Sequence, residues 1–283
     1  MIRFIDEHGI YISTSLDGPE DLHNINRPNP SKNSYRLTVE NIRKLQEVVG
    51  PNRVSALMTT TRESLKQPER IVDEYLSLRF KSIFVRPLNP YGREIANKEA
   101  VSYDVDSWLQ FYKKTLDYII AVNVQGVFFR EDLASIVLKK MLTPYGTGFV
   151  DLQSPSGTGI GVLVYNYDGS VYPSDESRML AEMGDETFLL GNLLQNSYEQ
   201  IVYSDKLIDI IRDTMLEGVP QCSECAFRPY CGADPVRHYR QQGDFVGHKP
   251  TSEFCNLHMS VTKHLVNVLE TNPSARRVLL GWI

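Results

Sequence analysis

Residues 10–19 read IYISTSLDGP, and this stretch decides how the first part of the chain folds. The run at 10–16, rich in Ile, Tyr and Thr, predicts a strand, and Asp17-Gly18-Pro19 predicts the turn that ends it. Similar patterns elsewhere predict strands at 54–58 and 83–85 and helices at 34–49, 69–78 and 105–122. Strands and helices that alternate over short joints are typical of parallel βα units, and we expect about three of them.

The residues before this stretch predict a short helix at 1–8, which ends at Gly9. Three βα units form too little parallel sheet to cover both of its faces and to close its edges. We therefore expect the natural domain to have further βα units before Met1, and the present chain to be a fragment of it.

The pattern changes from about Gly126, where the regular alternation ends. The residues that follow predict a helix at 132–141, a joint rich in Gly, Pro and Ser at 144–161, a hairpin at 161–173 with Asp168-Gly169 at its turn, mostly helix at 193–216 and a final helix at 260–269. The sequence therefore predicts a second domain of different construction.

The composition excludes several classes of partner. The chain of 283 residues has 42% hydrophobic and 23% charged residues, which is ordinary for a soluble globular protein. Its net charge of −5 argues against a nucleic-acid partner or an anionic membrane, since both need a basic surface. No apolar stretch approaches the ~20 residues of a membrane span, and the first eight residues do not form a signal peptide. We expect a cytoplasmic protein.

All four cysteines lie close together in the sequence, as Cys222-x2-Cys225-x5-Cys231-x23-Cys255. A Cys-x2-Cys step lets two thiolates reach one ion or cluster from a single turn, and two later thiolates complete the set. The segment around the first three cysteines has few aliphatic residues and cannot form a core alone. Metal binding would supply its folding free energy. The sequence therefore predicts one four-cysteine metal site.

Three kinds of site compete for this pattern. Disulfides are disfavoured, because nothing in the sequence indicates export and cytosolic thiols stay reduced. Structural zinc and an iron–sulfur cluster are about equally compatible with the spacing alone. Three histidines in or just past the interval, His238, His248 and His258, are further candidate ligands, although we expect them to face solvent.

Two stretches that lie far apart resemble the same group of enzymes. Residues 12–19, ISTSLDGP, continuing to His23 and Arg27, resemble the strand and loop of radical S-adenosylmethionine (SAM) enzymes that modify peptides. Gly169-x4-Ser174, followed by the cysteine pattern, resembles the SPASM domain appended to those enzymes. Residues 171–180, VYPSDESRML, are most similar to the His-Xaa-Ser system radical SAM maturases. Together the resemblance covers nearly the whole chain.

The resemblance implies an α/β fold, in which a partial (β/α) radical SAM barrel is followed by a small irregular α+β SPASM-like domain. It places the carboxy-terminal half of the barrel at 1–125 and a connecting segment at 126–165. The SPASM-like iron–sulfur domain then covers 166–262, and a C-terminal helix and tail cover 263–283.

The cysteine pattern departs from that of the SPASM family in one coherent way. The family has seven cysteines, whereas here Ser174 holds the Gly-x4 position and Pro235 the x3 position after Cys231. In the family the missing cysteines belong to an inner auxiliary cluster, and the four that remain hold the outer one. One complete site is therefore kept and one is lost. This favours an auxiliary [4Fe-4S] cluster over zinc.

A second departure concerns the chemistry that SAM cleavage requires. Radical SAM enzymes use a Cys-x3-Cys-x2-Cys motif on the first barrel loop to hold a second [4Fe-4S] cluster that binds SAM, and no such motif occurs here. The resemblance places that motif upstream of Met1, in a full-length parent protein. As given, the chain is not expected to cleave SAM.

The resemblance also implies candidate ligand contacts. Ser13 and Ser15 lie at the end of a barrel strand, where such barrels keep their sites, and would face SAM; small hydroxyl residues also pack and cap turns there. Asp17 either supports the Asp-Gly-Pro turn or touches the ligand. Arg27 either pairs with a carboxylate of SAM or substrate or forms a structural ion pair.

Asp175 follows the position of a lost cysteine. In related sulfatase-maturing enzymes an aspartate at this place is proposed to remove a substrate proton, and a buried carboxylate could act in this way. Residues 175–178 also read as an ordinary helix start with favourable acids. Both interpretations of Asp175 remain open.

The sequence thus predicts the carboxy-terminal portion of a radical SAM enzyme that modifies a ribosomally made peptide or protein. Its partners would be that substrate and, as a candidate, a partner maturase. The alternative is a non-catalytic peptide-binding or scaffold protein with a structural four-cysteine zinc site.

Overall fold

The computed structural model describes residues 1–91 and 101–283, and the chain divides into two compact units. The first unit consists of Met1–Leu88, Glu99–Leu138 and Lys263–Ile283, and the second of Asn89–Lys98 and Lys139–Thr262. None of the helices in the described ranges combines the length and the hydropathy that a bilayer span requires.

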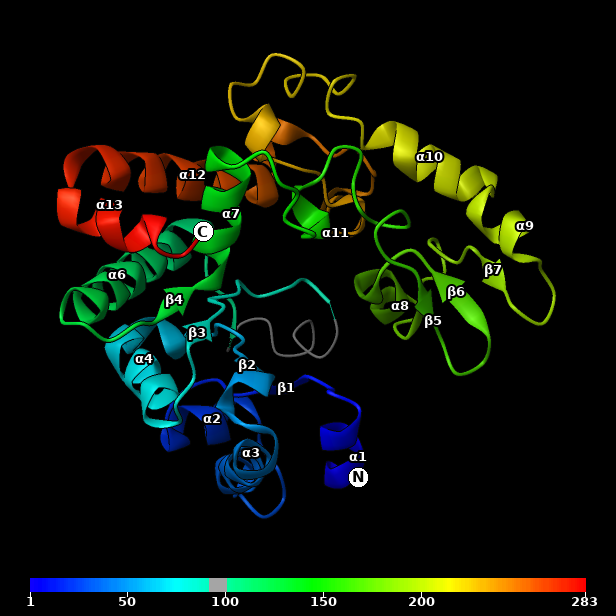
Figure 1. The fold of residues 1–283 in the computed structure, drawn as a ribbon. Helices are drawn as coiled ribbons and strands as arrows, with labels where there is room; N and C mark the ends of the chain where they lie inside the picture. The colour runs from blue at the N-terminus through cyan, green and yellow to red at the C-terminus, as the bar shows by residue number, and fades with distance from the viewer. Residues whose placement is uncertain (92–100) are drawn as a thin grey trace. The chain divides into compact units, whose positions relative to one another are not determined.

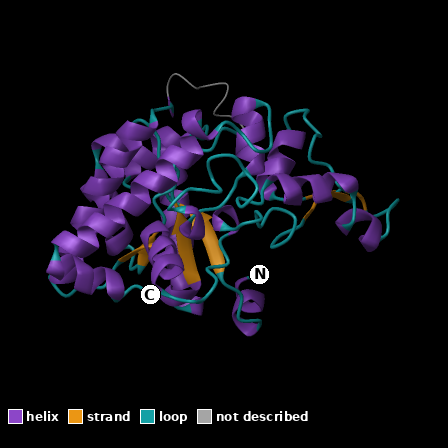
Figure 2. Ribbon diagram, turned by 90° about the horizontal axis from the view of Figure 1, so that it is seen from above, coloured by secondary structure: helices purple, strands orange, loops and turns teal. Residues whose placement is uncertain are grey.

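The first unit contains two pairs of parallel strands. Strand β1 (Ile12–Ser15) pairs with β2 (Val54–Leu57), so that Ile12 lies opposite Val54. Strand β3 (Ser82–Ile83) pairs with β4 (Arg130–Glu131). Helices flank these pairs (Figures 1 and 2). The helices with residues in this unit are α1 (Ile2–Glu7), α2 (Glu20–Asn26), α3 (Ser34–Val49), α4 (Pro68–Ser77), α6 (Val105–Val124), α7 (Asp132–Leu142), α12 (Glu253–Thr271) and α13 (Pro273–Leu280).

Each long helix forms because it buries one apolar face. Helix α3 buries Val39 and Ile42, and α4 begins with a proline, whose fixed φ suits the first helical position. Helix α6 starts where the Asp104 side chain accepts a hydrogen bond from the Ser107 amide, and it buries Trp108 completely. The strands and helices alternate as the sequence predicts, which confirms the parallel βα arrangement.

The structure corrects some of the predicted elements. The third strand, predicted at 83–85, covers only Ser82–Ile83, because the Val85 amide donates to a side chain instead of to a neighbouring strand. Strand β4 and helices α2 and α13 were not predicted. Strand β4 is two residues long and charged, so it has no apolar run to reveal it. The predicted final helix at 260–269 is the later part of α12, and α13 follows it.

The second unit contains a small antiparallel sheet of β5 (Val164–Tyr165), β6 (Ser170–Tyr172) and β7 (Gly191–Asn192). Strands β5 and β6 form the hairpin predicted from Asp168-Gly169. Among the described residues, the α-helices wholly within this unit are α8 (Asp175–Ala181), α9 (Tyr198–Val202), α10 (Asp205–Asp213) and α11 (Pro235–Gln242). Helices α9 and α10 cover most of the stretch at 193–216, as predicted, whereas α11 was not predicted.

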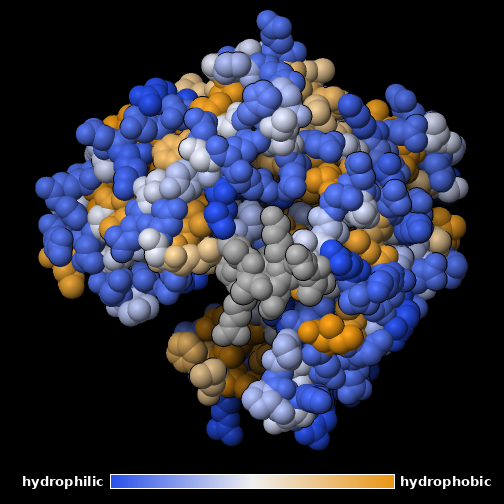
Figure 3. Space-filling model, turned by 180° about the vertical axis from the view of Figure 1, so that it is seen from behind, coloured by the Kyte–Doolittle hydropathy of each residue, from blue (hydrophilic) through white to orange (hydrophobic). Residues whose placement is uncertain are grey.

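Apolar side chains fill two small cores in the second unit. One consists of Tyr91, Leu180, Phe188, Ile210 and Val236, and the other of Val171, Leu190, Ile201 and Leu207. The face of the molecule in Figure 3 is mostly hydrophilic, with exposed hydrophobic side chains in several groups. Neither core of the second unit includes a cysteine, so the cysteine segment gains little from them.

In the first unit, a buried carboxylate on β4 links the residues after β3 with helices α6 and α7. Glu131 is 0% exposed. It accepts hydrogen bonds from the amides of Val85 (3.1 Å) and Ala134 (2.6 Å) and from the hydroxyl of Tyr112 (2.7 Å). Burial raises the pKa of Glu131 to about 7, although these donors oppose the rise.

This raised pKa predicts a pH-dependent stability of the first unit. Between Glu131's ordinary pKa of 4.5 and about 7, the folded protein keeps a proton that the unfolded chain has lost. The unfolded state then binds fewer protons, so the Glu131 contribution to the free energy of unfolding falls as the pH rises through this window. Urea unfolding should therefore show a larger loss of stability from pH 5 to pH 7.5 in the wild type than in Glu131→Gln. Equal losses in the two proteins would contradict this assignment.

Candidate functional site

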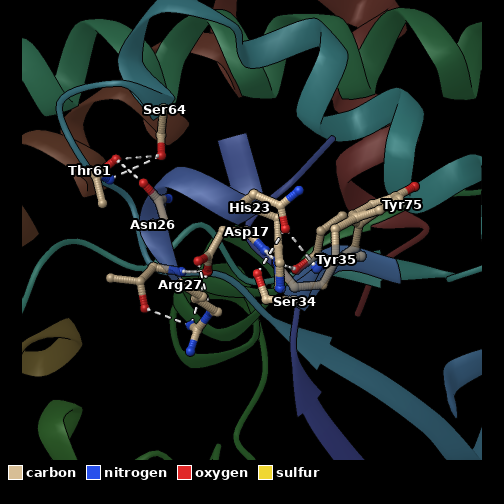
Figure 4. Close-up of polar contacts among 12 residues, drawn as sticks. Asp17, His23, Asn26, Arg27, Ser34, Tyr35, Thr61, Ser64 and Tyr75 are labelled. Atoms are coloured by element: carbon tan, nitrogen blue, oxygen red, sulfur yellow. Dashed lines mark hydrogen bonds and ion pairs between the residues drawn. The ribbon is translucent and has the colours of Figure 1, made fainter. Parts of the chain in front are cut away.

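The loop after β1 is organised around the buried carboxylate of Asp17, which is 1% exposed. Arg27 donates to it through Nε (2.8 Å) and Nη2 (3.0 Å), and the Thr59 amide donates over 3.0 Å (Figure 4). Since Thr59 follows β2, this carboxylate ties together the ends of two neighbouring strands. Asp17 and Arg27 therefore form a structural ion pair, which was one of the two predicted alternatives.

Further polar side chains fix the same loop. The ring of His23 is buried and accepts a hydrogen bond from the Asp17 amide through Nδ1 (3.3 Å). Burial lowers the pKa of His23, and nearby Arg27 lowers it further, against the opposing effect of Asp17. Thr61 donates to Asn26 over 3.0 Å, beside Ser64 (Figure 4). This network gives the strand ends a defined conformation.

Ser13 and Ser15 occupy alternate positions of β1, so their side chains point to the same face. Ser13 is exposed and Ser15 is half-buried. Gly18 ends the turn with a positive φ of 133°, and a Cβ atom there would lie 3.0 Å from Ile71 Cγ1, which only glycine avoids. The predicted SAM contacts of both serines remain predictions.

Two Arg–Asp pairs in the first unit differ in burial and allow a matched test. We predict that Asp17→Ala destabilises the first unit by about 1–3 kcal/mol, because the Thr59 amide and Arg27 lose their acceptor. Asp21→Ala should have a much smaller effect, because Asp21 pairs with Arg70 at the surface, where the two side chains are 56% and 57% exposed. Urea unfolding followed by tryptophan fluorescence measures both. Similar shifts for the two variants would refute the role of Asp17.

The four cysteines lie in the second unit, and none forms a disulfide. The Cys225 amide donates to the carbonyl of Cys222 (3.0 Å), so the first two cysteines share one turn. Cys231 follows the short helix η5 (Arg228–Tyr230). Cys255 lies in the first turn of α12, where its amide donates to the Ser252 hydroxyl (3.2 Å). A helix N-terminus stabilises a thiolate, so Cys255 has a suitable place for a ligand.

The thiols interact electrostatically with one another. Burial raises the pKa of Cys222 and Cys255 and raises that of Cys231 to about 11. Negative charge on neighbouring cysteines raises these pKa values further: Cys255 and Cys225 act on Cys222, and Cys225 acts on Cys255. Each thiol is thus close enough to others to affect their ionisation.

Two lysines bring positive charge to the same place. Lys249 is 8% exposed and lowers the pKa of both Cys222 and Cys255, while Lys140 lowers that of Cys231. Burial lowers the pKa of each lysine, and the cysteines oppose that effect. The donor set of four thiols with nearby cations fits a negatively charged thiolate-bound metal centre.

The described residues do not place three or more His, Cys, Asp or Glu side chains as ligands of one metal ion. In a tetrahedral zinc site with Zn–S bonds of about 2.3 Å, the sulfurs lie about 3.8 Å apart. In a [4Fe-4S] cluster each thiolate binds its own iron, which needs a wider set. The four-cysteine ligand set itself remains a prediction.

The histidines near the cysteines differ in exposure. His248 is exposed as predicted, but the prediction was wrong for His238, which is 1% exposed and lies 3.0 Å from the Ser252 hydroxyl. His258 is half-buried and packs on Phe254, with ring centroids 4.3 Å apart. Burial, with nearby positive charge, lowers the pKa of His238 and His258 to about 3. The Ser252 hydroxyl therefore links His238 to the amide of Cys255.

The two positions where the SPASM pattern lacks cysteines both begin helices. Ser174 caps α8 in a capping box with Ser177, and Pro235 is the first residue of α11. Asp175 is 62% exposed and pairs with Arg178 over 2.9 Å. Asp175 thus lacks the burial that the general-base prediction requires, and its geometry suits the alternative role as an acid at a helix start.

Comparison with solved structures identifies the fold. Native anSMEcpe with bound AdoMet and Kp18Cys peptide matches with a TM-score of 0.71 and 18% identity, over 94% of this chain and 71% of that one. A histidine-tagged form of anSMEcpe with bound AdoMet matches with a TM-score of 0.72 and 17% identity, over 99% and 71%. The chain has the radical SAM/SPASM fold.

Sequence comparison also finds relatives of this chain. A cysteine-type anaerobic sulfatase-maturating enzyme from Clostridium perfringens is 22% identical over 253 residues, which is 86% of this chain. An uncharacterised protein from Archaeoglobus fulgidus is 24% identical over 218 residues, which is 75% of this chain. The chain spans 63% and 48% of the length of these two relatives. No protein-family model matches the chain.

Proposed function

We propose that this chain serves in the radical SAM-dependent modification of a peptide or protein and that it carries one auxiliary [4Fe-4S] cluster. The structural match is the observation that carries this proposal. Nearly the whole chain superposes on an enzyme solved with both AdoMet and a peptide, so the two units have counterparts in a protein that binds this kind of cofactor and substrate.

In this proposal the first unit contributes to the SAM site. Ser13 and Ser15 share one face of β1, next to the loop that Asp17 and Arg27 hold in place. The two serines are therefore our candidates for SAM contacts, while Asp17 and Arg27 would position the loop. Together with a SAM-binding cluster, this site would supply the radical that abstracts a hydrogen atom from the substrate.

The second unit would hold the auxiliary cluster on Cys222, Cys225, Cys231 and Cys255. The thiols affect one another's pKa, and the loss of one complete ligand set of the SPASM pattern with the other kept favours a four-iron cluster over zinc. Such a cluster supplies electron transfer, a substrate contact or structural support when it is bound. In this proposal the chain's own contribution is the supply of four thiols and two cations.

The finer assignments extend this proposal. Residues 171–180 support a maturase of the His-Xaa-Ser system. We also propose that it acts in the cytoplasm, with a partner maturase as a candidate associate. Domain limits near 125, 165 and 262 would separate the barrel, the connecting segment and the cluster domain. Each of these is a proposal that rests on the sequence motifs.

Metal analysis tests the cluster directly. We expect protein purified without oxygen to contain about four irons and four sulfides and to absorb broadly in the visible range. A colourless protein with one zinc would overturn the proposed cluster and would favour a scaffold role. Production of 5′-deoxyadenosine by the full natural protein, with SAM and a peptide substrate, tests the enzymatic part.

Replacement of one ligand should affect only one unit. We predict that Cys222→Ala loses the metal and unfolds the second unit locally, because that unit's cysteine segment lacks a core of its own. Both tryptophans, Trp108 and Trp282, lie in the first unit, so their fluorescence reports that unit alone. The fluorescence transition in urea should stay unchanged while the transition in circular dichroism shifts. Ser223→Ala is the matched control, and identical circular dichroism curves for all proteins would contradict the prediction.

A further inference from the structure

Lys140, on α7, bridges two backbone segments beside a cysteine. Its ammonium group donates to the carbonyl of Cys231 (2.7 Å) and also to the carbonyl of Leu152. The side chain is half-buried, so these hydrogen bonds are partly shielded from water. One charged group therefore holds the Cys231 backbone against the segment at 151–153.

The packing at the next residue shows how closely these two segments approach. A Cβ atom on Gly232 would lie 2.5 Å from the Cα atom of Leu152, and it would also meet the backbone of Asp151 and Gln153. Contact with backbone atoms cannot be relieved by a side-chain rotation. The position of Cys231 is thus fixed by backbone packing on one side and by the Lys140 ammonium on the other.

Lys249 supplies a second cation from a different segment. It lies in the short helix η6 (Lys249–Thr251), and its ammonium group donates to the Val246 carbonyl. It interacts electrostatically with Cys222, Cys255 and Cys231. Nearby cysteines raise the pKa of both lysines, against the larger effect of burial.

The charges of the metal centre and the lysines match. Four thiolates carry −4, and the [4Fe-4S] core in its usual oxidised form carries +2, which leaves a centre of about −2. Two lysines carry +2. Without them, a partly buried centre would bring uncompensated negative charge into a poorly solvated region, which is costly.

We propose that Lys140 and Lys249 are positioning residues for the four-cysteine centre, which they hold by charge compensation, and that Lys140 also fixes Cys231. This inference rests on the proposed cluster. Residues that orient metal ligands from outside the ligand set commonly change metal affinity by about 10–100-fold when they are replaced. We therefore expect an effect of that size.

The decisive variant is Lys140→Met, which keeps an unbranched side chain of nearly the same length but removes its charge and its hydrogen bonds. Lys206→Met is the matched control, because Lys206 is also half-buried and donates to a single backbone carbonyl, that of Leu189 (3.0 Å), away from the cysteines. Lys140→Arg keeps the charge and the donors. The three variants and the wild type are compared as metal-loaded full chains.

Two measurements separate charge compensation from simple packing. Loss of metal to a chelator should be about 10–100-fold faster in Lys140→Met than in Lys206→Met, and Lys140→Arg should restore most of the retention. The reduction potential of the cluster should shift to more negative values in Lys140→Met, because a nearby cation stabilises the more negative, reduced form. Lys249→Met should shift it in the same direction, and it carries the test should Lys140→Met not fold.

Failure of this inference is distinct from failure of the proposed function. Equal metal loss in Lys140→Met and Lys206→Met would overturn it, as would faster loss with an unchanged potential and no rescue by arginine. A wild type that holds zinc would overturn the proposed cluster, and the chelator rates alone would then decide the role of the lysines.

Discussion

Four thiolates can share one centre only where their mutual repulsion is offset, and in the proposed function this constraint would govern the second unit. Among the described residues, the segment at 220–232 adds no side chain to either apolar core, so its conformation depends on polar contacts and on what the sulfurs bind. Burial and the neighbouring thiols raise the pKa of Cys222 and Cys231, so the protein opposes negative charge at these sulfurs. Positive charge that can offset the repulsion comes from a lysine on α7, a lysine on η6 and the N-terminus of α12. These segments lie far apart in the sequence.

The first unit also buries ionisable groups, in this case two carboxylates. Asp17 and Glu131 are both buried, and each lies just past or within a strand, but their partners differ. Asp17 has a guanidinium group, that of Arg27, as its ion-pair partner. Glu131 receives only neutral donors, so burial dominates and its pKa rises to about 7. Both carboxylates join consecutive strands, which is what keeps short parallel strands in place when their ladders contain few hydrogen bonds.

The sequence predicts the elements that have a strong apolar period and misses those that depend on contacts. Helix α3 and the β1–β2 pair could be found because their apolar residues recur at helical or strand spacing. Strand β4 could not, because Arg130-Glu131 becomes a strand only through its pairing with β3 and the hydrogen bonds of Glu131. The burial of His238 was missed for a similar reason, since it depends on Ser252, fourteen residues later in the chain.

The candidate site, too, could be predicted from the sequence only in part. Cysteine spacing predicts a ligand set, but the lysines near it carry no local signal: Lys140 precedes Cys231 by ninety-one positions, and only folding brings the two together. The two positions where the SPASM pattern lacks cysteines can be interpreted from the sequence more directly. Ser174 and Pro235 are residues that begin helices, serine as a cap and proline at the first position, and they begin α8 and α11 here. A cysteine at either place would serve the helix less well, so the absence of a second ligand set coincides with a gain in local structure. In the proposed function the second unit would therefore support one thiolate centre, with helix starts where the SPASM pattern would place further ligands.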